Sequence, residues 1–368
     1  MPPHVGGVER VAEQLAEVYR GAGHSVTWLA TAPPLRPGVT AEGGIRRIRI
    51  PGANGLEARL GMPFPLVGPR GLRAIAAAVA DTDLVHLHDC LYLPVVAAEQ
   101  AARRARVPTI VTQHVAFVSF GVAVDPLLRL AYRTVGRRVL RRAAGIAFVN
   151  EHVREWFVEN VDPAVGGTVI PNAVDTTRFA PGDRDRRVGA RIALGLPPDG
   201  PVVAFVGRLV AKKGLRVLAA AIARLPDVRL LVIGDGPDRA IAESLGAQVT
   251  LHRQLPHQAM PAAYLAADVF GLVSRGEGMP VALIEALASG LPAVVSDDPG
   301  FAALAGCAGV LRVRPDVATV ATALRSLLAD RAALAARATA ARRWALERHA
   351  LEAFGARYLT LADAALRR

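Results

Sequence analysis

Two glutamates, Glu277 and Glu285, interrupt the stretch EGMPVALIEALASG, whose other residues have the pattern of a buried helix. A strand pattern ends at about Arg275, a glycine-flanked turn follows, and Pro280 suits the first turn of a helix. A helix start attracts anions because it presents unpaired amide groups and the positive end of a dipole. We expect Glu277 in the turn and Glu285 two turns into the helix, roughly 10 Å away.

That separation is comparable with the distance between a sugar and a ribose across a diphosphate. Each carboxylate could therefore accept hydrogen bonds from hydroxyl groups at opposite ends of one ligand. The alternative is a helix cap at Glu277 and an ordinary exposed Glu285. These residues alone leave both interpretations open.

Two cations in the stretch VGRLVAKKG favour the ligand interpretation. Arg208 lies just past a predicted strand, and Lys213 precedes Gly214 at a predicted helix start. Both are expected over the same sheet edge as Glu277. A pair of cations there can neutralise a departing diphosphate. A solvated turn would explain the lysines but not Arg208.

Short apolar runs alternate with helical patterns along most of the chain, which predicts parallel sheets covered by helices. Two doubly wound α/β domains are expected, joined near residues 172–200, and residues 316–367 have only helical patterns. The predicted strands are 25–31, 45–50, 83–89, 108–114 and 145–151 in the first half, and 201–209, 228–236, 248–254, 269–275 and 292–298 in the second.

One strand is missing from this pattern. The segment GGVERVAEQLAEVYRGAGHSV has the pattern of a glycine turn and the first helix of a doubly wound domain, yet only MPPHV precedes Gly6. Without a central strand there, two neighbouring strands lose many backbone hydrogen bonds. We therefore expect a natural start roughly a dozen residues upstream, or a terminus that replaces the strand in another way.

The composition indicates a globular protein. Of 368 residues, 52% are hydrophobic, which suffices for a large core and about two domains. No run approaches the ~18 apolar residues of a membrane span, and the first residues lack a secretory signal pattern. Cys90 and Cys307 are expected as small buried hydrophobic residues rather than reactive thiols. A cytoplasmic location is expected, either free or in peripheral contact with the inner face of the membrane.

The net charge of +12 predicts attraction to polyanions or anionic lipid. In YRTVGRRVLRR, Arg133, Arg137 and Arg141 recur at four-residue spacing, and Arg138 and Arg142 flank them. This basic helix face is either simply solvated or contacts a membrane or an acidic substrate. Nucleic-acid binding is disfavoured because aromatic residues are few and are not interleaved with the arginines.

Taken together, GGVE, IPNAVD, VGRLVAKKG, LVIGDGP and EGMPVALIEALASGLPAVVSD resemble the retaining nucleotide-sugar glycosyltransferases of family 4 (glycosyl transferases group 1). The resemblance spans nearly the whole chain. It implies the GT-B fold, in which two Rossmann-like domains face each other across a cleft. Residues 1–172 would bind the acceptor, 173–345 the donor, and a last helix within 346–368 would cross back to the first domain.

The resemblance also implies roles for individual residues. Arg208 and Lys213 would hold the diphosphate, Glu277 the hydroxyls of the donor sugar, and Glu285 those of the ribose. His114, at a predicted strand end, would lie beside the donor sugar and join Glu277, Arg208 and Lys213 as a catalytic candidate. The other implied donor contacts are Gly6 and Gly7 near the phosphate or acceptor, Arg253, Gln254 and Leu255 beside the nucleobase, and the backbone of Gly278, Met279, Pro280 and Val281.

The implied reaction moves a hexosyl unit from a UDP-sugar or GDP-mannose to a lipid-linked, polysaccharide or small-molecule hydroxyl, with retained configuration. The usual proposal is front-face attack, which needs no carboxylate nucleophile. Neither a metal nor a cofactor is expected besides the co-substrate, and Asp297, Asp298 and HLHD at 86–89 are interpreted as strand-end residues rather than metal ligands. Two residues depart from the family pattern. Ala173 stands where glycine is common, which affects a local turn, and Asn150 stands where serine is frequent, so no hydroxyl role is carried over.

Other functions fit the fold less well. A sugar-nucleotide epimerase or a phosphorylase would share the GT-B fold, and an epimerase would release nucleotide without an acceptor. A nicotinamide-dependent oxidoreductase would need a glycine fingerprint. The nearest match, GDGPDR, has Arg239 where a third glycine or alanine belongs, and it follows the second strand of its domain.

Overall fold

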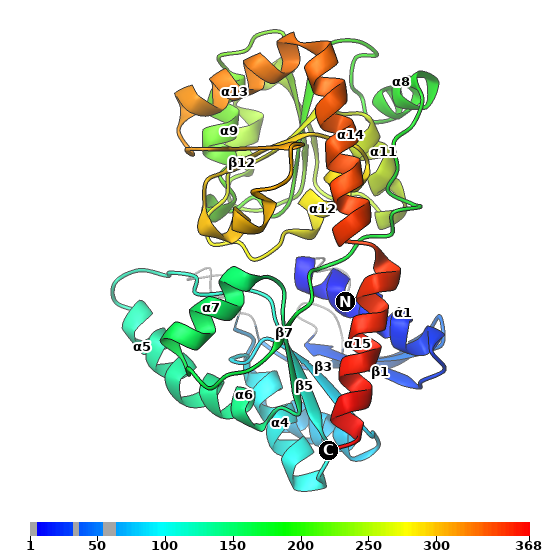
Figure 1. The fold of residues 1–368 in the computed structure, drawn as a ribbon, viewed down its shortest axis with the longest axis vertical. Helices are drawn as coiled ribbons and strands as arrows, with labels where there is room; N and C mark the ends of the chain where they lie inside the picture. The colour runs from blue at the N-terminus through cyan, green and yellow to red at the C-terminus, as the bar shows by residue number, and fades with distance from the viewer. Residues whose placement is uncertain (1–5, 32–36, 54–63) are drawn as a thin grey trace. The chain divides into compact units, whose positions relative to one another are not determined.

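The computed structural model describes residues 6–31, 37–53 and 64–368 (Figure 1). The chain divides into two compact units. The N-terminal unit comprises Met1–Pro171 and Glu352–Arg368, and the C-terminal unit comprises Asn172–Leu351. The final segment of the chain therefore belongs to the unit that the first half forms.

The C-terminal unit contains a six-stranded parallel sheet in the order β10-β9-β8-β11-β12-β13. Counted from β8, this is the doubly wound order 3-2-1-4-5-6, whose direction reverses between β8 and β11. Its central strands are buried on both faces, which explains their nearly continuous apolar runs. The strands are β8 (Val202–Val206), β9 (Arg229–Ile233), β10 (Val249–His252), β11 (Val269–Leu272), β12 (Ala293–Ser296) and β13 (Val310–Val313).

Helices cover both faces of this sheet (Figure 1). The side chain of Asp316 caps the start of α13 by accepting from Thr319 N, and that of Asp330 caps α14 by accepting from Ala333 N. The helices are α8 (Arg184–Ala193), α9 (Leu215–Ile222), α10 (Arg239–Glu243), α11 (Met260–Leu265), α12 (Val281–Ala288), α13 (Val317–Ala329) and α14 (Arg331–Arg348), with short 3₁₀ turns at Ala211–Lys213, Gly246–Gln248, His257–Ala259 and Pro299–Leu304.

The N-terminal unit contains two separate sheets. In the first, β3 (Ile45–Ile50) pairs in parallel with β1 (Val26–Thr31) and antiparallel with β2 (Gly38–Glu42). The second is parallel and consists of β4 (Val85–His88), β5 (Thr109–Gln113), β6 (Gly145–Phe148) and β7 (Thr168–Val169). The helices are α1 (Gly7–Gly21), α3 (Pro69–Ala80), α4 (Leu93–Ala105), α5 (Asp125–Ala131), the π-helical turn η1 (Tyr132–Gly136), α6 (Arg137–Arg142), α7 (Glu151–Asn160) and α15 (Leu351–Leu366).

The prediction of a missing first strand concerns MPPHV, residues 1–5, which lies outside the described residues. Within the described residues, no strand joins the sheet of β1 to the sheet of β4. A side-chain hydrogen bond links the two parts instead, from Tyr19 Oη of α1 to His86 Nδ1 of β4 at 3.1 Å.

The last helix, α15, packs on the N-terminal unit, as the family resemblance implied. Gly145 lies so close to Leu361 that a Cβ at that glycine would approach its side chain to 2.7 Å. Tyr358 is fully buried, and its hydroxyl lies 3.0 Å from Thr112 Oγ1 of β5. The helical tail thus completes the core of the first unit.

The ten predicted strands are confirmed, although each ends earlier than or where predicted. Three strands were not predicted. β2 is exposed along its whole length, β7 has two residues, and β13 is an edge strand that carries Arg312. None of them has the apolar pattern of a buried strand.

Candidate functional site

The candidate site of the C-terminal unit lies where the strand order reverses, at the carboxyl ends of β8 and β11. Ligands of open α/β sheets bind at this position. The loop after β8 carries Arg208 and Lys213, and the loop after β11 carries Glu277. A backbone hydrogen bond from Arg275 N to Lys212 O, 2.8 Å long, joins the two loops.

Lys213 and Glu277 form an ion pair, with 2.7 Å between Nζ and Oε1. Their side chains are only 17% and 8% exposed. Burial raises the pKa of Glu277, but the charges of Lys213 and Lys212 outweigh burial and hold that pKa below its usual range. Glu277 is therefore ionised at neutral pH. The predicted placement of these two side chains at one sheet edge is confirmed.

Two glycines allow the loops to approach each other. Gly214 has φ +73°, and a Cβ there would lie 2.2 Å from the carbonyl oxygen of Val273. A Cβ at Gly300 would lie 2.0 Å from the carbonyl oxygen of Glu277. Only glycine fits at these points.

Asp298 fixes the loop that carries Glu277. Its carboxylate accepts hydrogen bonds from Gly276 N at 3.0 Å and from Gly300 N at 2.9 Å. The sequence predicted an ordinary strand-end turn here, and Asp298 does lie in such a turn. The hydrogen bond to Gly276 was not predicted.

Asn172 fixes the next part of the same loop. Its side-chain Nδ2 donates to Met279 O at 2.7 Å, and its own carbonyl accepts a bond from His349 Nδ1 at 2.6 Å. Gly278, Met279 and Val281 are buried, so this part of the loop packs against the interior of the C-terminal unit. Neither Asn172 nor His349 was predicted as a site residue.

Glu285 is buried rather than exposed, with 6% of its surface accessible. The interpretation of Glu285 as an ordinary exposed residue is therefore wrong. Because α12 begins at Val281, Glu285 lies about one turn into the helix and not two. Tyr264 Oη donates to its Oε2 at 2.8 Å, and His257 Nε2 lies 3.4 Å from its Oε1. Sequence reasoning missed Tyr264 and His257, although His257 ends the HRQLPH loop.

The predicted base-side loop follows β10. Arg253 and Gln254 are exposed and Leu255 is partly buried. Arg253 Nε lies 3.0 Å from Asp235 Oδ2, which follows the neighbouring strand β9. Arg208, after β8, is also exposed. The polar side chains of Arg208, Arg253 and Gln254 therefore lie at the carboxyl edge of the sheet.

The glycines of GDGPDR serve backbone packing. Cβ atoms at Gly234 and Gly236 would lie 1.9 Å from Gly207 O and 2.4 Å from Leu209 O. Arg239 pairs with Glu243. The glycines thus face the loop after β8, and this geometry gives no support to a dinucleotide fingerprint.

The N-terminal unit carries the remaining predicted residues. Gly7 begins α1, and the backbone amide of Gly6 donates to the carboxylate of Glu9 at 3.0 Å. His114 follows β5, is 5% exposed, and has its Nε2 atom 2.9 Å from His88 Nδ1. Burial is the main cause that holds the pKa of His114 well below its usual value, and the neighbouring His88 lowers it further. The ring is therefore neutral at pH 7.

Comparison with known proteins identifies the family. The model of glycosyltransferase family 4 matches residues 5–178, and that of glycosyl transferases group 1 matches residues 190–344. A GDP-mannose-dependent alpha-(1-6)-phosphatidylinositol monomannoside mannosyltransferase of Mycolicibacterium smegmatis is 31% identical over 98% of this chain and 95% of its own length. The chain belongs to the family-4 glycosyltransferases.

This glycosyltransferase also resembles a phosphatidyl-myo-inositol mannosyltransferase of the same organism, with 32% identity over 91% of the chain and 85% of the relative. Among solved structures, sucrose-phosphate synthase from Thermosynechococcus elongatus matches with a TM-score of 0.80 and 25% identity, over 97% of this chain and 93% of that one. Anabaena HepE, solved with UDP and glucose, matches with a TM-score of 0.76 and 18% identity, over 96% and 95%. The glycosyltransferase therefore has the GT-B fold.

Three further expectations concern the cysteines, membrane-spanning helices and metal ligands. Cys90 and Cys307 are buried and unpaired, as predicted. In the part of the glycosyltransferase that the structure describes, no helix is long and apolar enough to cross a membrane. The same residues include no group of three or more His, Cys, Asp or Glu side chains placed to hold a metal ion.

Proposed function

We propose that this chain is a retaining, metal-independent hexosyltransferase that uses a nucleoside-diphosphate sugar and no further cofactor. The observation that carries the proposal is the buried Lys213–Glu277 pair at the point where the strand order reverses. A lysine can hold a diphosphate and an ionised glutamate can accept hydrogen bonds from sugar hydroxyls. One ion pair thus provides both contacts at the bond that breaks.

The donor would extend across the carboxyl edge of the sheet. Arg208 and Lys213 would bind the diphosphate, and the first turn of α12 would add its dipole. Glu285, held by Tyr264, would accept from the ribose hydroxyls. Residues 253–255 would flank the base, and the backbone of 278–281 would meet the sugar and phosphates. Gly6, Gly7 and His114 stay predicted contacts of the N-terminal unit.

Retention follows from front-face attack. The bond between the anomeric carbon and the phosphate oxygen breaks, the acceptor oxygen bonds to the same face of that carbon, and the acceptor proton passes to the departing phosphate. The chain's part is to position the reactants and to stabilise the developing negative charge. Arg208 and Lys213 would supply that charge in place of a metal.

GDP-mannose and a lipid-linked acceptor are the preferred substrates in this proposal. Two relatives that match over 98% and 91% of the chain carry names that specify mannosyl transfer to phosphatidylinositol lipids. UDP-sugars are the second donor candidate, because HepE has the same fold and was solved with UDP-glucose. The transferase would then work at the inner face of the membrane without spanning it.

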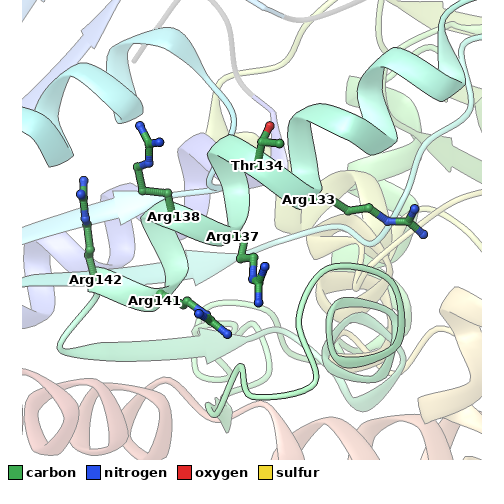
Figure 2. A pocket seen from close by; sticks show the side chains of 6 residues that line it. All are labelled: Arg133, Thr134, Arg137, Arg138, Arg141 and Arg142. Carbon is green, nitrogen blue, oxygen red and sulfur yellow. The ribbon is translucent and has the colours of Figure 1, made fainter.

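The segment Asp125–Arg142 supplies a surface for that contact. η1 interrupts its helix, and the arginines separate into two rows: Arg137 and Arg141 point to one side, Arg138 and Arg142 to the other (Figure 2). The five arginines nevertheless line one pocket together with Thr134, so the predicted basic face is present, with the two rows on its two sides.

Buried carboxylates neutralise part of this charge. Arg137 Nε lies 3.0 Å from Asp162 Oδ2, Arg141 also binds Asp162, and Arg142 Nη1 lies 3.4 Å from Glu99 Oε1. Within the described residues, Arg138 has no such partner. The six arginines of the segment against Asp125, Asp162 and Glu99 leave an excess of three positive charges.

The first half of the same segment, with the loop before it, exposes several apolar side chains. Val122, Leu127 and Leu130 are 95%, 69% and 56% exposed. Exposed apolar side chains beside an excess of arginine suit the interface of an anionic bilayer, where the apolar groups enter the headgroup layer and the arginines bind phosphates. We propose this surface as the membrane contact.

The test is a transfer assay with the purified chain. GDP-mannose and a panel of UDP-sugars are offered with vesicles that contain phosphatidylinositol, and nucleoside diphosphate release and glycolipid mass are followed. Release that requires the lipid acceptor, persists in EDTA and yields the donor's anomeric configuration by NMR is expected. Release without acceptor would favour an epimerase, and release that depends on inorganic phosphate would favour a phosphorylase. Either result would replace the proposal.

A further inference from the structure

Three histidine rings form a layered stack in the N-terminal unit. His86 and His88, two residues apart on β4, have ring centroids 4.9 Å apart and an interplanar angle of 10°. The ring of His88 stacks in turn on that of His114, at 5.2 Å and 23°. His114 follows the adjacent strand β5 and is the only one of the three that the family resemblance assigns to the site.

Each ring of the stack is held by hydrogen bonds. His88 Nδ1 lies 2.9 Å from His114 Nε2. His86 is fixed at both nitrogens, by Tyr19 Oη at 3.1 Å and by Thr112 Oγ1 at 2.8 Å. The hydroxyl of Thr112 also bonds to Tyr358 of α15. The last helix of the chain therefore supports the ring on which His88 rests.

The bond between His88 and His114 joins two neutral rings. Burial lowers the pKa of His88 to about 4 and holds that of His114 well below its usual value. A hydrogen bond between two neutral imidazoles contains one proton, on either Nδ1 of His88 or Nε2 of His114. The tautomer of one ring therefore fixes the tautomer of the other.

We infer that His88 is a positioning residue that fixes which nitrogen of His114 carries the proton and leaves His114 Nδ1 as the one ring nitrogen able to meet a substrate hydroxyl. This inference deepens the proposed function, since it rests on His114 lying beside the donor sugar. With Nε2 engaged, the tautomer of His88 decides whether His114 Nδ1 donates to a substrate hydroxyl or accepts from it.

The direct test reads the ring nitrogens by ¹⁵N NMR of histidine-labelled, substrate-free protein, with His114→Gln for assignment. In the wild type, a scalar coupling through the hydrogen bond between His88 Nδ1 and His114 Nε2 is expected, together with a single tautomer of His114. This measurement needs no variant at position 88. Two freely exchanging tautomers of His114 in the folded wild type would overturn the inference.

Two variants separate positioning from packing. His88→Phe keeps a stacked ring without the hydrogen bond, and His88→Asn places an amide group close to the position of Nδ1. In His88→Phe the ¹⁵N shifts of His114 should move toward a tautomer average and kcat should fall roughly tenfold, the effect of one lost hydrogen bond. His88→Asn should recover most of both. His24→Gln, an exposed histidine of the same unit, is the matched control.

The outcomes distinguish the two proposals. If His114 shifts are unchanged in His88→Phe, or if His88→Asn behaves like His88→Phe in both measurements, His88 does not position His114. If the shifts respond as expected but the wild type transfers no sugar, the positioning role stands and the proposed function fails.

Discussion

The Nζ atom of Lys213 lies 2.7 Å from Oε1 of Glu277, although 64 positions separate the two residues in the sequence. The pair exists because β8 and β11 are adjacent parallel strands whose loops leave the same edge of the sheet. Both side chains are withdrawn from water. Lys213 therefore helps to keep the buried carboxylate of Glu277 ionised.

Replacement of Lys213 by Met should lower kcat by roughly 10²- to 10³-fold, because the departing diphosphate loses a preorganised cation. The pH dependence of stability should change as well. In the wild type the depressed pKa of Glu277 contributes stability above the usual carboxyl range, and this contribution is lost as pH falls through the depressed pKa. Without Lys213, the one cation left to oppose the effect of burial is Lys212 and the pKa of Glu277 rises, so the stability deficit of Lys213→Met should be larger at pH 7.5 than at pH 4.

Urea unfolding at both pH values measures this deficit. Arg216→Met, an exposed substitution on α9, is the control and should show neither effect. The double variant Lys213→Met with Glu277→Gln should recover part of the deficit at pH 7.5, because no unpaired buried carboxylate remains. An equal deficit at pH 4 and pH 7.5 would contradict the coupling of the two side chains.

Replacement of Glu285 by Gln should weaken binding of the preferred nucleoside diphosphate about tenfold, equivalent to about 1.4 kcal/mol, with a smaller effect on kcat at saturating donor. Titration calorimetry with GDP and UDP measures the loss. Glu243→Gln, an exposed carboxylate of the same unit, should bind like the wild type. Tyr264→Phe removes the donor to Glu285 Oε2 and should cost about 1 kcal/mol of stability. Unchanged nucleotide affinity in Glu285→Gln would remove Glu285 from the ribose site.

Replacement of Arg138 by Glu should reduce binding to vesicles rich in phosphatidylglycerol by roughly tenfold, since it removes one of three excess positive charges and adds a negative one. Leu127→Ser should weaken the same binding and leave its salt dependence unchanged. Arg331→Glu and Ile192→Ser, exposed positions of the C-terminal unit, are the matched controls. Sedimentation at low and high salt gives the result. If both control variants lose as much binding as the test variants, the segment is not the contact surface.

Replacement of Asp89 by Asn should stabilise the protein increasingly as pH rises from about 4 to 7. Burial raises the pKa of Asp89 to about 7, so the folded state favours the protonated acid and loses stability as pH rises toward that value. Asn tolerates the left-handed backbone at this position, φ +63°, and its Oδ1 can still accept from Gln113 Nε2 and His114 N.

Urea unfolding of both proteins across this pH range checks the prediction for Asp89. Asp81→Asn, at an exposed aspartate, should show a constant difference from the wild type. A difference for Asp89→Asn that shrinks with rising pH would show that the carboxylate is the favoured form in the folded protein.

The sequence by itself determined the elements with a strong local signal. Apolar runs such as 201–206 predicted the central strands because side chains buried on both faces leave no polar position. The glycine turn and Pro280 predicted the start of α12, and the rule that parallel strands end at one edge brought Lys213 to Glu277. The edge strand β13 and the exposed β2 were missed because exposed strands need no apolar pattern.

Only the tertiary structure decided the partners of the site residues. Tyr264 and His257 contact Glu285, Asn172 holds the loop at Met279, and His88 contacts His114, each across a separation that no local periodicity encodes. The burial of Glu285 likewise depends on α11 packing beside α12. Side-chain pairing and burial arise where distant segments pack together. The candidate site residues could therefore be predicted from the sequence, but the residues that hold them in place could not.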